Sequence, residues 1–151
     1  MMRKLRYTLS LSGNDQRLLF QAWLLLLVVD LGLRIAPFRF IQKLLTVTSK
    51  STSLENISEE DTFQNVERIV DVAGNNHLYP MTCLRRALVL QRLLALRGIE
   101  TELRFGVHKG GNKLSAHAWL EYQGQSVSER RESYQEFIPI STQEVHQRVN
   151  H

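Results

Sequence analysis

The chain has little of the residue types that build covalent or metal-held frameworks. Cys83 is the only cysteine among 151 residues. This excludes an internal disulfide and a cysteine-based structural zinc site, and it is typical of a reducing compartment. We expect neither a metal site nor another cofactor, because the histidines are scattered without the spacing of metal ligands. They are His77, His108, His117, His146 and His151.

The signals for nucleic-acid binding and for a membrane span are also missing. The net charge is +4, but no basic stripe is interleaved with aromatic residues. A spanning helix needs about 20 mostly apolar residues, whereas the longest apolar run, residues 22–29, is bounded by Gln21 and Asp30. The run resembles the core of a signal peptide, but no clean cleavage site follows it. We therefore expect a cytoplasmic protein, with loose membrane association as the alternative.

A helical period of apolar residues runs through the first two thirds of the chain. It predicts one helix over about residues 14–33, a shorter one over 38–47 after Pro37, and a third that ends at Gly74. The exposed apolar part of the first helix is expected to contact a protein partner. Two inward faces are predicted: Phe38, Ile41, Leu44 and Leu45 in the second helix, and Phe63, Val66, Ile69, Val70 and Ala73 in the third.

After Gly98 the period of the apolar residues changes from helical to alternating, as in strands. A short edge strand at residues 137–140 would tolerate Pro139, because an edge strand leaves one side of its backbone unpaired. The other expected strands cover residues 101–108, 114–122 and about 125–130, with a turn at 109–112.

Helices followed by an antiparallel meander indicate an α+β fold. The length of 151 residues fits one domain. Its parts would be an N-terminal helical region over about residues 14–74, a cysteine-bearing helix over about 82–97 and a sheet over about 101–140. The flanking segments, residues 1–12, 48–56 and 142 onward, show no clear period.

The only cysteine lies where a helix is expected to begin. Pro80 interrupts the preceding chain, Thr82 is a favourable N-cap residue, and Gly98 can end the helix. Cys83 would therefore lie at the positive end of the helix dipole, which stabilises a thiolate. A small buried thiol without chemistry is the alternative.

The helical geometry predicts that Cys83 points toward the body of the protein. At about 100° per residue, Cys83 shares a face with buried-type residues. These are Ala87, Leu90 and Leu94, whereas Arg85, Arg86, Arg92 and Arg97 are expected on another side.

The second strand carries a candidate base, His117, on the same face as Trp119. Gln-Gly is a poor two-residue hairpin turn, so we expect a three-residue loop at residues 122–124 with Gly124 in the left-handed conformation. In that register His117 faces Glu129, and a slip by one residue would move Glu129 to the opposite side. If this face of the sheet packs on the cysteine helix, Cys83, His117 and Glu129 come together.

These three residue types match the needs of acyl transfer. A thiolate attacks a carbonyl carbon, an imidazole takes and returns the proton, and a carboxylate orients the ring. The backbone N–H of Cys83 is the natural first donor to an oxyanion. We expect Trp119 and Thr82 to line the substrate site.

Four segments together resemble the stand-alone B2 proteins of lasso-peptide biosynthesis, which are transglutaminase-like leader peptidases. The first two are Cys83-Leu84-x-Arg86-Ala87-Leu88 and Arg97-Gly98-Ile99. The others are Glu102-Leu103-Arg104-Phe105-Gly106-Val107 and Ala116-His117-Ala118-Trp119-Leu120-Glu121. The leucine-rich helix before Pro37-Phe38-Arg39 is also similar, so the resemblance covers nearly the whole chain.

This resemblance implies a papain-like cysteine protease of the bacterial cytoplasm that cuts the leader from a ribosomally made precursor. Its partners would be the precursor peptide, a separate leader-recognition protein and an ATP-dependent cyclase. The third residue of the family's triad is usually Asp, and the matching position here carries Glu129. Two alternatives remain open: transamidation or deamidation of glutamine by the same residues, and a non-catalytic peptide-binding scaffold.

Overall fold

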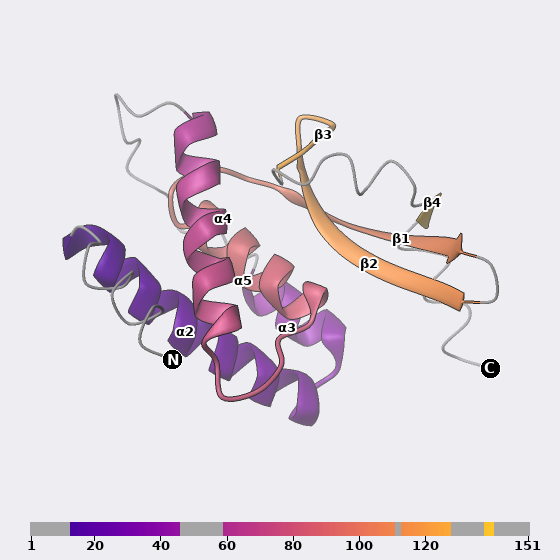
Figure 1. Cartoon of the computed structure of the whole chain (residues 1–151), viewed down its shortest axis with the longest axis horizontal. Helices are drawn as coiled ribbons and strands as arrows, with labels where there is room; N and C mark the ends of the chain where they lie inside the picture. Colours follow the sequence, from indigo (N-terminus) through magenta and orange to yellow (C-terminus); the bar gives the residue numbers. More distant parts are fainter. Residues whose placement is uncertain (1–12, 46–58, 111–112, 128–137, 141–151) are drawn as a thin grey trace.

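In the computed structural model, a group of helices packs against one side of a small antiparallel sheet (Figure 1). The structure describes residues 13–45, 59–110, 113–127 and 138–140. The predicted α+β fold is therefore confirmed. The helices are α2 (Gly13–Ile35), α3 (Phe38–Leu45), α4 (Glu59–Asn75) and α5 (Cys83–Ala95). The strands are β1 (Glu102–Gly110), β2 (Lys113–Tyr122), β3 (Gln125–Ser126) and β4 (Ile138–Ile140).

The core lies where α2, α4 and α5 meet. All five residues of the apolar face predicted for α4 are buried. The prediction for α3 is only partly right, because Ile41 and Leu45 are buried whereas Leu44 is 58% exposed. Ile41 packs so closely on α2 that a Cβ at Gly32 would lie 2.8 Å from its Cδ1. Because residue 32 is a glycine, Ile41 can pack directly on α2, and the side of α3 that carries Ile41 therefore faces the core.

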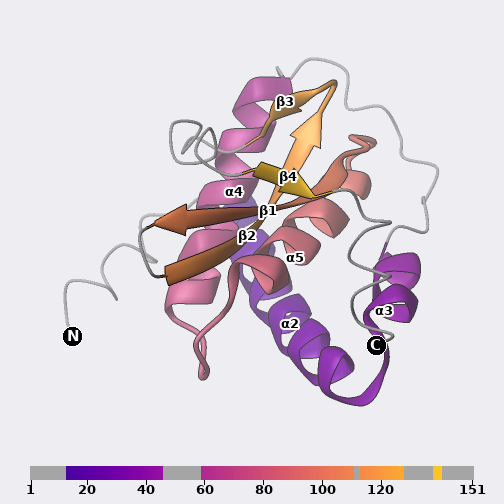
Figure 2. The same cartoon turned by 90° about the vertical axis from the view of Figure 1, so that its right-hand side faces the viewer.

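The sheet has the order β3-β2-β1-β4, and all of its described pairings are antiparallel. Leu103 lies opposite Leu120, and Phe105 lies opposite Ala118, on the face that covers the helices. β4 pairs with β1 at the edge of the sheet, where Pro139 lies opposite Gly106. The predicted edge strand is confirmed, but it pairs with β1 and not with β3, so the sheet is not the simple meander that was predicted. Figure 2 shows the sheet on one side of α5 and α2 on the other.

The predicted three-residue loop between β2 and β3 is wrong. Tyr122 pairs with Gln125, which leaves a two-residue turn of Gln123 and Gly124. Both residues have positive φ, 51° and 78°, as the preferred hairpin turn requires. Val127 donates its N–H to the Leu120 carbonyl over 3.0 Å and is buried. The longer loop would have placed Val127 on the other face of the sheet, so burial of Val127 accounts for the observed register.

Helix α2 is long and apolar enough to cross a membrane by length and composition, and it is the one such helix among the described residues. One side of it belongs to the core, where Leu18, Ala22, Leu26 and Val29 are buried. A core helix near the N-terminus passes the same length-and-composition test as a spanning helix.

The flanking segments named in the sequence lie outside the described residues. They are residues 1–12, the loop at 48–56 and the tail from 142.

Candidate active site

The cysteine helix begins at Cys83, as predicted. Thr82 occupies the N-cap position with an extended backbone (φ −72°, ψ 160°), and its side chain makes no capping hydrogen bond. The first backbone bond of the turn runs from the Arg86 N–H to the Thr82 carbonyl, over 3.2 Å. The Cys83 N–H is thus among the first-turn donors that have no acceptor within the helix. This is the position from which a backbone donor can meet an oxyanion.

The helix presents Cys83 toward the interior, as predicted from its periodicity. Ala87, Leu90 and Leu94 on the same face are buried, and Cys83 itself is half-buried. The buried residues anchor α5 in the core, while the first turn reaches the edge of a pocket. The thiol therefore has both a fixed backbone and an open side.

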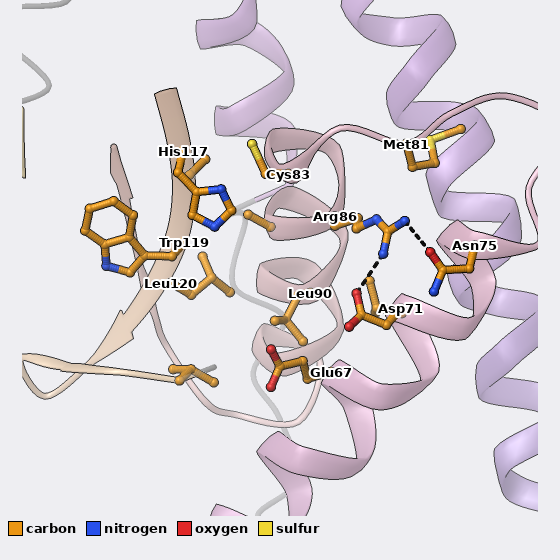
Figure 3. Close-up of a pocket in the computed structure, with 14 residues that line it drawn as sticks. Glu67, Asp71, Asn75, Met81, Cys83, Arg86, Leu90, His117, Trp119 and Leu120 are labelled. Carbon is orange, nitrogen blue, oxygen red and sulfur yellow. Dashed lines mark hydrogen bonds and ion pairs between the residues drawn. The ribbon is translucent and has the colours of Figure 1, made fainter. Parts of the chain in front are cut away.

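A pocket of about 350 Å³ lies between α4, the start of α5 and the middle of β2. It brings together Cys83 and His117, which are far apart in the sequence. In Figure 3 the imidazole of His117 lies beside Cys83, between β2 and the first turn of α5. The other lining residues are Glu67, Val70, Asp71, Asn75, Met81, Arg86, Ala87, Leu90, Ala118, Trp119, Leu120 and Val127.

The strand that carries His117 packs on the helices by the face opposite to the predicted one. The residues on its packed side are Ala118 and Leu120, whereas the predicted packed side carried Trp119. Figure 3 shows Leu120 directed toward α5 and Trp119 on the other side of the strand. His117 lies opposite Gly106 and is half-buried.

Trp119 is one of the residues that line the pocket. It is 5% exposed, and its ring stacks on that of His117 with centroids 6.5 Å apart and planes inclined by 15°. The indole N–H donates to Glu121 over 3.2 Å, and Glu121 also accepts a hydrogen bond from Arg104 over 2.9 Å. These bonds hold the indole, which in turn restricts the orientation of the imidazole.

A polar group in the same pocket was not predicted. Arg86 donates to Asp71 over 2.9 Å and to Asn75 over 2.8 Å (Figure 3). A Cβ at Gly74 would lie 2.9 Å from the Arg86 Nε, so glycine leaves room for the guanidinium. The expectation that Arg86 points away from the thiol is wrong, because three residues along a helix lead back to within about 60° of the starting direction. The sequence did contain a signal for this polar group. Polar side chains recur every four residues on one face of α4, at Glu67, Asp71 and Asn75.

The catalytic roles of Cys83 and His117 and the substrate contact of Trp119 stay predictions, and two further predicted site residues are not among the described residues that line the pocket. Glu129 lies outside the described residues, and the register that placed it opposite His117 is not the observed one. Its predicted role now depends on the family resemblance alone. Thr82 is exposed beside Cys83 but does not line the pocket, so its contact with a substrate is untested. No group of three or more His, Cys, Asp and Glu side chains in the described ranges is placed to hold a metal ion.

Comparison with known proteins places this arrangement in a family. No curated protein and no solved structure matches the chain significantly. The family model of the transglutaminase-like superfamily matches residues 25–142, which include the whole of α5, β1 and β2. This superfamily includes cysteine proteases and acyltransferases. The chain belongs to the transglutaminase-like superfamily.

Proposed function

We propose that this protein is a cysteine protease that removes the leader from a lasso-peptide precursor. It acts with a separate leader-recognition protein and supplies the freed core to an ATP-dependent cyclase. The observation that carries the proposal is the shared pocket of Cys83 and His117, in which the imidazole lies beside the thiol. The specific substrate is supported by the resemblance of the Cys83 and His117 segments to stand-alone leader peptidases.

The proposed reaction proceeds through a thioester. His117 takes the proton of the Cys83 thiol, and the sulfur attacks the scissile carbonyl carbon. The N–H of Cys83 donates to the oxyanion. The imidazolium gives its proton to the leaving amine as the C–N bond breaks. Water then attacks the thioester while His117 accepts a proton, which releases the leader carboxylate and restores the thiol.

The pocket offers more than the two reacting groups. Arg86, fixed by Asp71 and Asn75, places a positive charge one helical turn from the thiol. A fixed guanidinium is suited to hold a carbonyl or carboxylate of an extended peptide. Trp119 adds an apolar wall beside the imidazole. These features fit a peptide substrate that crosses the pocket from α4 toward β2.

The test is incubation of the purified protein with a precursor peptide encoded beside it, with and without the recognition protein, followed by mass spectrometry. We expect cleavage at one bond, which Cys83→Ala and His117→Ala reduce at least about 1,000-fold. His108→Ala is the matched control, since His108 lies on the neighbouring strand outside the pocket lining. It should cleave within about 3-fold of the parent.

The products separate the proposed activity from its alternatives. A mass change of glutamine residues without chain cleavage would indicate deamidation or transamidation by the same thioester chemistry. Iodoacetamide labelling at mildly acidic pH tests the thiol itself, because a thiolate paired with an imidazolium alkylates fast there. Slow labelling together with intact precursor would contradict the protease and favour a peptide-binding scaffold.

A further inference from the structure

The outward side of α2 is an apolar strip. Its residues follow one another at helical spacing, and each is between 45% and 77% exposed. At 1.5 Å per residue the strip is about 23 Å long. Figure 2 shows α2 on the side of the helical group away from the sheet. The residues of the strip are Phe20, Leu24, Val28, Leu31 and Ile35.

Asp30, the charged residue that argued against a membrane span in the sequence, does not lie on the strip. Asp30 interrupts the apolar run in the sequence, but in the fold it is 3% exposed and turned away from the strip. Its carboxylate lies 2.8 Å from Arg85 of α5 and 3.2 Å from Arg34. No acidic side chain among the described residues therefore belongs to the strip.

The excess of positively charged residues lies in the N-terminal third of the chain, which includes α2. Residues 1–45 contain seven Lys and Arg against two Asp and Glu, whereas residues 46–151 contain twelve against thirteen. The net charge of +4 thus comes from the segment that includes α2 and α3. Arg17 is exposed at one end of the strip, and Arg34, Arg39 and Lys43 are exposed at the other. α3 adds two exposed apolar residues there, Phe40 and Leu44.

We propose that the outer face of α2 and α3 docks on an anionic lipid bilayer, with α2 parallel to the surface. An apolar strip flanked by arginine and lysine is the pattern of helices that lie in the interface of anionic membranes. α2 cannot span the bilayer in this fold, because its other side carries Leu18, Ala22 and Leu26 into the core with α4 and α5. The strip is formed by a single helix, which fits a deformable lipid surface, and Phe20 at its N-terminal end also borders a small apolar hollow between α2 and α4. This inference does not depend on the proposed function.

The test is flotation of the purified full chain with vesicles of phosphatidylglycerol and phosphatidylcholine, and with vesicles of phosphatidylcholine alone. We expect at least about 10-fold more protein on the anionic vesicles, and a decrease as salt is raised. The double variant Leu24→Glu/Leu31→Glu should lose at least about 10-fold of this binding. The matched control is Ser115→Glu/Gln125→Glu, which adds the same charge at exposed positions of the sheet and should bind within about 2-fold of the parent.

Circular dichroism and thermal melting check that each variant is folded, which exposed substitutions should allow. A second pair, Arg39→Gln/Lys43→Gln, reports on charge alone and should reduce the preference for anionic vesicles without abolishing binding. Equal binding by the parent and the Leu24/Leu31 variant would overturn the proposal. Failure of the parent to float with anionic vesicles would also overturn it. Disruption of a homodimer, or of a complex with the recognition protein, by the same variant would then assign the strip to a protein partner.

Discussion

At the scale of single residues, two positions meet although they lie on different elements. Cys83 begins α5, and His117 lies in the middle of β2. Each alone has an ordinary structural explanation, as a small buried thiol or a histidine within a sheet. The pocket that both residues line is the reason for proposing that they have a chemical role together. Trp119 supports that role, since its stacked and hydrogen-bonded indole restricts the imidazole.

The first prediction concerns Glu129, the proposed third member of the triad. Glu129→Gln should slow precursor cleavage by about 10- to 1,000-fold without abolishing it, because an orienting carboxylate matters less than the nucleophile or base. Glu129→Asp should be nearly as active as the parent if the family's usual aspartate has the same place. Single-turnover cleavage rates would measure both. Parental rates for both variants would mean that Glu129 is a solvated charge, and the orienting group would lie elsewhere.

Asn75 and Asn76, at the end of α4, are polar residues that could orient the imidazole in place of Glu129, but both have other partners. Asn75 accepts a hydrogen bond from Arg86, and Asn76 donates to the carbonyl of Val72 over 2.7 Å. In Figure 3, Asn75 lies beyond Arg86 as seen from His117. Asn75 is therefore better suited to position the guanidinium than the imidazole.

At the scale of elements, the β2–β3 turn shows how packing decides a register. Gln123 adopts a left-handed conformation, which is unfavourable for a residue with a side chain by about 1 kcal/mol. The turn nevertheless forms, because it pairs Val127 with Leu120 and buries the valine. Burying one valine side chain contributes about 1.5–3 kcal/mol, which exceeds the cost at Gln123.

The second prediction follows from this strain. Gln123→Gly should raise the free energy of unfolding by about 0.5–1 kcal/mol, since glycine adopts positive φ without a steric penalty. Gly124→Ala is the contrasting variant, because φ at Gly124 is 78° with open space around it, and it should lower the free energy by about 1 kcal/mol. Urea unfolding curves measure both. A three-residue loop in solution would be indicated if Gln123→Gly were destabilising.

At the scale of the whole molecule, Asp30 joins the outer helix to the cysteine helix. Its buried carboxylate forms an ion pair with Arg85, two residues beyond Cys83. Arg34 forms the other ion pair but is 59% exposed, so water screens much of that interaction. Of the two ion pairs of Asp30, the one with Arg85 is therefore the better shielded from water, and it links α2 to the start of α5.

The third prediction tests this connection. Asp30→Asn should lower the free energy of unfolding by about 1–3 kcal/mol, because Arg85 loses its oppositely charged partner at a largely buried site. Asp61→Asn is the control: Asp61 is exposed in the first turn of α4, and its loss should cost less than about 1 kcal/mol. Denaturant titration gives both values. Equal effects of the two substitutions would show that the Asp30–Arg85 pair contributes nothing to stability.

The sequence by itself determined the main helices and strands and identified the candidate reactive residues. The apolar face of α4, the start of α5 at Cys83 and the strand period through His117 follow from interactions between residues close along the chain, which periodicity and capping record. Only the tertiary structure decided the register after Gln123, the inward direction of Asp30 and the presence of Arg86 in the pocket. Each of these depends on which distant surface a segment packs against, and a local pattern does not contain that information.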